Sequence, residues 1–497
     1  MAKNPIHAGS ARIWVIEGGV GPNRSPTYMG RAAIGTSSFN FGEATKVEEP
    51  DPTAYDQFIE VDSIAGAQER PTTSIRTRYS SDLSDLLRLA RKKCRLDLHV
   101  HLGKCRDPQD FNGGWEKIRV YPDGKISTWA DENSSAMESG DNASATEQVD
   151  LSARDIYEIG WLEFSQVGAA QSVREVLDMV ICDQLSCGGE CGNASDGYNK
   201  VFGLIAPLVG SVGASPRVVF SSDGFATADW DDVSTLTNSS TATTILCIGS
   251  NIVVVSDSGL SLSYTNRELL LAGAPVWVQS TTGFVAARGG TCGVVADARH
   301  TWIGGKAGYI YFTSDPSAGV TVASSGSLTN QDINKMAAYD DENVVAVGNL
   351  NAVLFTRDGV NWSFVTGPAS GVNLTAVACI GRGVWIVGCS NGAVYSTETY
   401  GSTWKLHTLP VTMTAIQDIK FVDETVGYLI GSASTRGYMF RTVCGGNSWY
   451  ALPERVGASV PLNDKMDNLA VARGVHNLVF AGGLADNGTS GFIVKGA

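Results

Sequence analysis

The stretch Val353-Leu354-Phe355-Thr356-Arg357-Asp358-Gly359, followed by Trp362, decides the fold because close copies of it recur along the chain. Each copy has a short apolar strand, a polar corner containing glycine, and a tryptophan. Further copies lie at residues 218–230 and 394–404, and a looser one lies at 439–449. Repetition of this kind indicates one structural unit that is used several times.

The spacing of the copies indicates the blades of a β-propeller. Trp362 and Trp404 are 42 residues apart, and Trp404 and Trp449 are 45 residues apart. Units of this length that contain only strand signals are typical of propeller blades. One unit shows four short strands, at 374–379, 383–388, 393–396 and 403–406. We therefore predict a propeller of six or seven blades over residues 201–497, closed by strands from both ends because the terminal copies are incomplete.

Turn chemistry explains the residue types at each corner. An aspartate side chain accepts hydrogen bonds from amides of its own turn, glycine adopts positive φ, and tryptophan covers the hairpin with apolar surface. The residues predicted to build these corners are Ser221, Asp223, Gly224, Thr356, Asp358, Gly359, Trp362, Ser396, Gly401, Trp404, Gly446 and Trp449.

The corner phrase resembles the Asp-box of the BNR and sialidase-like repeat families over about residues 200–497. That resemblance implies a glycosidase site with an arginine cluster, a tyrosine nucleophile and an aspartate acid/base. The arginines of this region are instead scattered, several of them in turns, and no opening Arg-Ile-Pro phrase is present. We therefore predict that the chain is not an enzyme, that it has no cofactor and no metal site, and that its propeller is a rigid binding or packing body.

Residues 1–187 lack the recurring phrase and predict a separate domain, joined to the propeller by a Gly-rich junction at 188–200. Apolar strands are expected around Trp14 and at 73–78, 96–102, 115–120 and 156–164. One amphipathic helix is expected at 82–93, since Leu83, Leu86, Leu87 and Ala90 share a face and Ser81 is a suitable N-cap. The predicted fold class is mainly β, with a β-sandwich or barrel and one helix before the propeller.

The order of these elements resembles the tail tube proteins of long-tailed bacteriophages. The resemblance rests on the strand around Trp14, the small-residue phrase at 32–36, the turn at 49–52 and the single helix between two strands. It implies a virion structural protein, made in the host cytoplasm, whose copies form stacked rings that conduct DNA. In this hypothesis the propeller faces outward as a decoration of the tube. Its expected partners are other copies, other tail proteins, and genomic DNA that passes without specific binding. The alternative function is a propeller that binds or hydrolyses host-surface glycans, carried on an adaptor domain.

Charge and hydropathy narrow the function further. The chain carries a formal charge of −14, with 21 bases against 30 acids before residue 201 and 16 against 21 after it. A nucleic-acid reader needs a basic face, whereas an acidic lumen would let DNA pass without binding it. Net acidity also simply favours solubility, so this observation leaves both readings open. No apolar run has the length of a membrane span, and the first residues lack a secretory apolar segment.

The cysteines and histidines give weaker evidence for disulfides and metal sites than the repeats give for the fold. For Cys94, Cys105, Cys182, Cys187 and Cys191 we weigh disulfides, free thiols and a zinc site, and the sequence leaves all three open. Cys187 and Cys191 are predicted to form a disulfide in mature particles. Free buried thiols are expected at Cys247, Cys292, Cys379 and Cys389, which lie in or beside apolar strands. His99 and His101 share one face of a strand, a placement that metal ligation would permit. Their alternation with apolar residues favours a solvated polar face instead, and this is our prediction.

Overall fold

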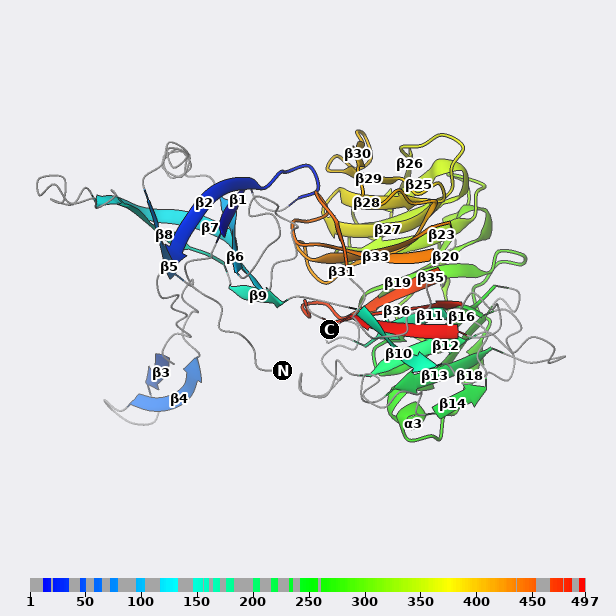
Figure 1. Cartoon of the computed structure of the whole chain (residues 1–497). Helices are drawn as coiled ribbons and strands as arrows, with labels where there is room; N and C mark the ends of the chain where they lie inside the picture. The colour runs from blue at the N-terminus through cyan, green and yellow to red at the C-terminus, as the bar shows by residue number, and fades with distance from the viewer. Residues whose placement is uncertain are drawn as a thin grey trace, which may run out of the picture. The chain divides into compact units, whose positions relative to one another are not determined.

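The computed structural model describes residues 12–18, 21–34, 45–50, 58–64, 72–78, 95–102, 117–132, 146–154, 156–160, 164–169, 176–182, 200–205, 216–221, 232–235, 242–257, 261–434, 436–452, 465–476, 478–484 and 491–496 (Figure 1). The chain divides into two compact units. The first comprises Met1–Val20 and Arg24–Trp161, and the second comprises Gly21–Asn23 and Leu162–Ala497. The predicted helix at 82–93 lies outside the described residues.

The main described sheet of the first unit has seven strands, six of which pair into a closed cycle. The seven strands are β1 (Arg12–Glu17), β2 (Thr27–Ile34), β5 (Thr72–Arg78), β6 (Leu96–Leu102), β7 (Lys117–Glu132), β8 (Thr146–Ser152) and β9 (Tyr157–Gly160). Their order is β6-β1-β2-β5-β8-β7-β9, and β6 also pairs with β7. All these pairings are antiparallel, so six strands follow one another around a ring, the connectivity of a small barrel. A separate hairpin joins β3 (Thr45–Pro50) to β4 (Phe58–Ile64).

Both faces of the β1–β6–β7 region are buried. On one face Ile13, Leu98 and Tyr121 belong to a hydrophobic core cluster. On the other face His99 and His101 are completely buried, and the ring of His101 lies 4.3 Å from that of Trp14. The prediction of a solvated histidine face was therefore wrong. Alternation indicates which residues share a face, but it does not reveal whether a second layer covers that face.

Burial lowers the pKa of His99 to about 3, and burial together with the charge of His99 lowers that of His101 well below its usual value. Between pH 6.5 and 3 the unfolded chain takes up a proton at each position, whereas the folded chain does not. We therefore expect stability to fall as pH falls, by up to about 1.4 kcal/mol per pH unit for each histidine. Urea titrations of the first unit's unfolding at a series of pH values would measure this slope.

In the same titrations, His99→Met should flatten the slope of the first unit's stability against pH. The control variant His300→Gln replaces a partly exposed histidine of the second unit and should leave this slope unchanged. Equal slopes for the two variants would contradict the assignment.

The second unit is a seven-bladed propeller, built from seven four-stranded antiparallel sheets. Blade 1 is β11 (Val176–Ile181), β12 (Val201–Ile205), β13 (Arg217–Ser221) and β14 (Asp232–Thr235). Blade 2 is β15 (Ala242–Ile248), β16 (Asn251–Ser256), β17 (Ser261–Asn266) and β18 (Val278–Ser280). Blade 3 is β19 (Gly290–Asp297), β20 (His300–Gly305), β21 (Tyr309–Thr313) and β22 (Thr321–Ser325). Blade 4 is β23 (Ile333–Ala338), β24 (Val344–Gly348), β25 (Ala352–Thr356) and β26 (Trp362–Thr366).

Blade 5 is β27 (Leu374–Gly381), β28 (Val384–Cys389), β29 (Val394–Thr397) and β30 (Lys405–His407). Blade 6 is β31 (Ala415–Phe421), β32 (Gly427–Ala433), β33 (Arg436–Thr442) and β34 (Tyr450–Ala451). Blade 7 combines β10 (Phe164–Ala169) with β35 (Lys465–Val471), β36 (Val479–Leu484) and β37 (Gly491–Gly496). The pairing of β10 with β37 closes the ring with strands from both ends of the propeller sequence, as predicted.

The ring begins earlier in the chain than the sequence indicated. The prediction assigned residues up to 187 to the N-terminal domain, yet β10 and β11 form sheets with propeller strands. The only α-helix within the described residues is the five-residue α3 (Arg267–Leu271), capped by the Asn266 side chain. No described helix meets the length and apolarity that a membrane crossing requires.

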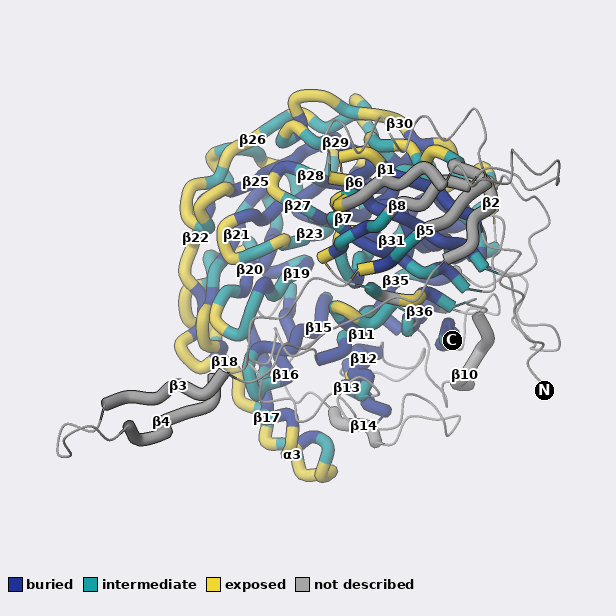
Figure 2. Tube along the Cα trace, turned by 90° about the vertical axis from the view of Figure 1, so that its left-hand side faces the viewer, coloured by how far each residue is buried: buried dark blue, intermediate teal, exposed yellow. Residues whose placement is uncertain are grey.

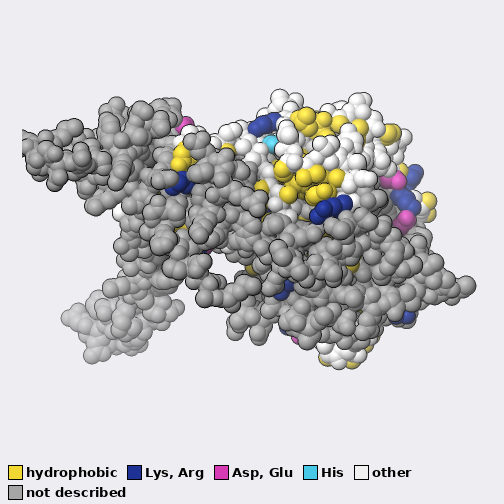
Figure 3. Space-filling model, in the orientation of Figure 1, with side chains coloured by type: hydrophobic (Ala, Val, Ile, Leu, Met, Phe, Trp, Pro, Cys, Tyr) yellow, Lys and Arg dark blue, Asp and Glu magenta, His cyan; other side chains and the backbone are white. Residues whose placement is uncertain are grey.

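Burial is greatest in the second strand of the blades and least in the outermost strand, and inner strands such as β19 and β23 are only partly buried. The second strands β24 (Val344–Gly348) and β28 (Val384–Cys389) are almost wholly buried, and each lies between two other strands of its own blade. The outer strands β22 and β26 lie at the exposed rim (Figure 2). They carry half-exposed apolar residues such as Val322 and Phe364, and Figure 3 shows apolar side chains gathered on the described surface of the propeller.

A disulfide joins Cys182, directly after β11, to Cys247 in β15, with the two Cα atoms 5.5 Å apart. It therefore links the inner strands of blades 1 and 2. Cys182 was among the candidate disulfide residues, but the prediction of a free thiol at Cys247 was wrong, because the partner comes from the neighbouring blade and lies 65 residues away. Cys292, Cys379 and Cys389 are free, as predicted, and so is Cys444. Cys94, Cys105, Cys187 and Cys191 lie outside the described residues.

We expect the Cys182→Ser, Cys247→Ser double variant to lose about 2–4 kcal/mol of propeller stability, because the bond restricts a long loop of the unfolded chain. Urea unfolding of the oxidised parent protein and of the variant would measure the loss. Reductant should destabilise the parent protein and leave the variant unchanged, while Cys389→Ser should keep the parent's response. Alkylation of both Cys182 and Cys247 in the non-reduced protein would contradict the bond.

Candidate functional site: the central channel

The corner of blade 4 has the predicted turn chemistry. One carboxylate oxygen of Asp358 accepts hydrogen bonds from the amides of Val360 and Asn361 at 3.0 and 2.7 Å, and from the Thr356 hydroxyl at 3.0 Å. Hydrogen bonds, first of all from the Asn361 side chain and amide, lower the pKa of this exposed carboxyl. Gly359 has φ 71°, as a residue in this turn requires.

The corner of blade 5 differs from the prediction by one residue. Thr397, not Ser396, corresponds to Thr356 of blade 4. The Thr397 hydroxyl accepts hydrogen bonds from the amides of Thr399 and Gly401 at 3.1 and 3.0 Å. Strand β29 continues through Thr397, so the side chain of Ser396 lies on the other face of the strand and contacts His407 Nε2 at 2.6 Å.

In blade 6, Thr442 accepts the amides of Cys444 and Gly446 at 3.3 and 2.9 Å, so a cysteine stands where blade 4 has its aspartate. Ser221 is the buried last residue of β13, while Asp223 and Gly224 lie outside the described residues. Trp404 packs on Trp385 and Trp449 on Phe421, with ring centroids 6.5 and 6.0 Å apart. The predicted residues thus lie in separate blades, and each supports its own hairpin.

Polar groups come together instead along the propeller axis. The inner strands β11, β15, β19, β23, β27, β31 and β35 surround a cavity of about 420 Å³. Each of these seven strands has a β-bulge near its beginning. The residues skipped in the strand pairing are Leu177, Thr243, Thr291, Asn334, Thr375, Gln417 and Asp467. A bulge bends the strand and redirects side chains, which here lets a polar group reach the next blade.

Five inter-blade hydrogen bonds have a donor side chain at or directly after the bulge and an acceptor carbonyl directly before the bulge of the next blade. They run from Thr243 to Gly290 O (3.0 Å), Thr291 to Ile333 O (2.5 Å), Asn334 to Leu374 O (2.9 Å), Thr375 to Ile416 O (2.5 Å) and Asn468 to Val176 O (2.6 Å). The last of them joins blade 7 to blade 1.

Buried aspartates supply the two remaining junctions. Asp178 accepts the amide of Ile245 in blade 2, and Asp418 accepts the amide of Leu469 in blade 7, both at 3.1 Å. Asp178 also accepts the Thr244 hydroxyl. Together with the five donors they complete seven junctions, one between each pair of adjacent blades. We call this set the clamp ring.

Lys335 interacts electrostatically with both of these acids. Its Nζ lies 3.7 Å from Asp418 Oδ2, and the small Ala376 occupies the intervening blade. Burial works to lower the pKa of Lys335, but the charges of Asp418 and Asp178 outweigh it, so the pKa is raised. The side chain therefore stays an ammonium and neutralises buried negative charge, as buried ions require.

Arg473, which follows β35, crosses to blade 3. Its guanidinium donates to the carbonyls of Ala296 and Val295 at 2.8 and 2.5 Å. Blade 3 lies three positions around the ring from blade 7, so this side chain spans the channel near the ends of the inner strands.

The channel shows no activated nucleophile among its described residues. Burial raises the pKa of the Cys292 thiol to about 12, which keeps it protonated at neutral pH. Lys335 is held as an ammonium, and an ammonium cannot attack a carbonyl. What the described channel groups do is form hydrogen bonds between neighbouring blades, and sequence reasoning missed them. Their signal is a polar residue near the beginning of each inner strand, repeated at about the blade period. It is the second residue in β15, β19, β23 and β27 and the third or fourth in β11, β31 and β35 (Asp178, Asp418 and Asn468).

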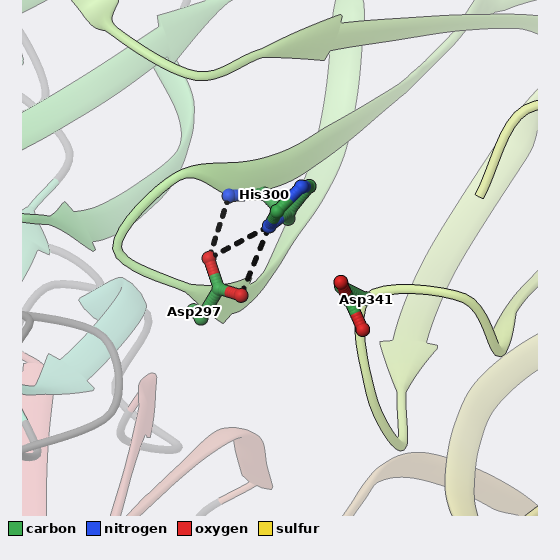
Figure 4. A group of neighbouring side chains, drawn as sticks. All are labelled: Asp297, His300 and Asp341. Atoms are coloured by element: carbon green, nitrogen blue, oxygen red, sulfur yellow. Dashed lines mark hydrogen bonds and ion pairs between the residues drawn. The ribbon is translucent and has the colours of Figure 1, made fainter.

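A second cluster, Asp297, His300 and Asp341, brings three metal-ligating side chains within 4.8 Å of one another (Figure 4). Asp297 already accepts the amides of Arg299 and His300 at 2.7 and 2.9 Å, and both its oxygens lie 2.9 Å from His300 Nδ1. Asp340 and Asp423 accept amides in the same way in blades 4 and 6. Asp297 is therefore accounted for as a hairpin residue.

No family model matches the sequence, and no curated protein matches it. Solved propellers are similar in fold. YCF48 from Cyanidioschyzon merolae is 13% identical over 67% of this chain and 98% of its own, with a TM-score of 0.45. Selenomethionine-substituted virginiamycin B lyase from Staphylococcus aureus is 9% identical over 68% of this chain and 98% of its own, with a TM-score of 0.47. At these identities the likeness concerns the fold alone.

We expect Thr375→Val to destabilise the propeller by about 1 kcal/mol, because it leaves the Ile416 carbonyl without its partner in the clamp ring. Thr321→Val on the exposed outer strand β22 is the matched control and should cost less than about 0.5 kcal/mol. Urea unfolding of both variants would measure the difference. Equal stabilities would show that the hydrogen bond between blades 5 and 6 contributes nothing measurable.

Proposed function

We propose that the chain is a structural subunit of a bacteriophage tail. Its N-terminal unit assembles into stacked rings around passing DNA, and its propeller is a rigid body attached to each subunit. The observation that carries the proposal is the clamp ring, because its polar side chains join neighbouring blades and none is an activated nucleophile. A propeller built in this way serves as a body that packs or binds.

Two further features support this function. The order of strands in the N-terminal region resembles that of tail tube proteins, and the acid excess of this region fits a lumen that repels phosphate. A closed set of strand pairings also protects the described sheet from uncontrolled edge pairing, so assembly would use defined surfaces.

Electron microscopy of the purified, concentrated full-length protein tests the proposal directly. We expect rings or short tubes with one propeller-sized projection per subunit, and a matching repeat in virions that contain the chain. A protein that stays monomeric at every concentration and is absent from virion tails would contradict the proposal.

A glycan array distinguishes the alternative function on the same protein. Binding to defined glycans by a monomer that forms no rings would favour a carbohydrate-binding propeller. Glycan binding by assembled rings would instead leave the assembly role in place and add a second one.

A further inference from the structure

Two charged side chains in the central cavity, Asp178 and Lys420, form no close ion pair within the described part of the chain, and Asp178 has only a longer-range interaction with Lys335. Asp178 is 8% exposed and accepts only amide and hydroxyl hydrogen bonds. Lys420, on β31, lines the same cavity and has neither a hydrogen bond nor an ion pair among the described residues. Buried or half-buried charges without counter-ions are costly, so each of them favours a ligand group of opposite sign.

These two charges lie at different levels along the axis. Asp178, Lys335 and Asp418 all occupy the position directly after the bulge of their strands, where two acids face one base. Lys420 is two residues further along β31 than Asp418, which places it about 7 Å deeper along the strand direction. Asp467, at the bulge of β35, also lines the cavity, so the layer near the bulges has an excess of acids, and the next layer carries the positive charge of Lys420.

The other described cations of the cavity do not neutralise the acids near the bulges. Lys335 is shared by Asp418 and Asp178, and one ammonium cannot neutralise two carboxylates. Arg473 is held by two carbonyls of blade 3 near the far end of the inner strands. The cavity volume of about 420 Å³ falls within the range of small-molecule sites, roughly 300–1,000 Å³.

From this arrangement we propose that the central cavity binds a small zwitterion of the ω-amino acid type. Its ammonium lies toward Asp178 and Asp418, and its carboxylate lies toward Lys420. The ligand supplies the missing counter-ion at both levels at once. A molecule with only one of the two charges would satisfy one level and leave the other unpaired.

Calorimetry with three probes of equal chain length tests the site on the unmodified full-length protein. We expect 6-aminohexanoate to bind at least about ten-fold more tightly than hexylamine or hexanoate, a difference that corresponds to about 1.4 kcal/mol. Equal affinities for all three probes, or no binding of 6-aminohexanoate, would overturn the proposal. Tighter binding of hexylamine than of the zwitterion would mean a simple cation site and would overturn it as well.

Variants locate the two ends of the ligand. Asp178→Asn keeps an oxygen for the clamp ring but removes the charge, and it should reduce zwitterion affinity to that of hexanoate. Lys420→Met should reduce it to that of hexylamine, whereas Lys420→Arg should retain it. Asp341→Asn, an exposed charge change outside the cavity, is the matched control and should leave affinity unchanged. Unchanged affinity in both Asp178→Asn and Lys420→Met would overturn the assignment, and the comparison of the three probes does not depend on any variant folding.

Discussion

The hydrogen bonds between neighbouring inner strands are the constraint on which the propeller depends. Sheets that pack face to face around an axis leave their innermost strands side by side with no backbone pairing between them. The clamp ring supplies that link at every junction, either through a hydroxyl or amide that reaches a carbonyl or through an aspartate that accepts an amide. Because a buried carbonyl without a partner is costly, each link fixes the position of the next blade.

The β-bulges explain how one strand can serve two neighbours. In a regular strand, side chains alternate between the two faces, and backbone groups are used within the sheet. The extra residue at the bulge frees one side chain from this alternation, as Thr291 and Asn334 show. Directly after it, the strand returns to its alternation and presents Asp178, Lys335 or Asp418 to the channel. The same irregularity therefore produces both the inter-blade contacts and the charges that line the cavity.

The propeller has one further topological constraint, the closure of its ring, and one covalent constraint, a disulfide. The strand β10 joins the C-terminal strands of blade 7, so unfolding either end of the propeller opens the ring. The Cys182–Cys247 bond fixes blade 1 to blade 2 next to that closure. Ring closure and this bond act where the chain enters the propeller, whereas the clamp ring acts uniformly around the axis.

The sequence by itself determined the repeated unit, its four strands and the chemistry of its corners, because these depend on contacts within a single blade. The Asp358 turn has the predicted hydrogen bonds, and the incomplete terminal copies correctly indicated closure from both ends. The one-residue shift from Ser396 to Thr397 reflects a strand end, which depends on pairing with β28.

Only the tertiary structure decided which distant residues meet. Cys182 bonds to Cys247 across a blade boundary, His99 is buried although its strand alternates, and Asp178, Lys335 and Asp418 come together from blades 1, 4 and 6. The physical reason is that periodicity records which face a side chain occupies, whereas the partner on that face is set by the closure of the ring.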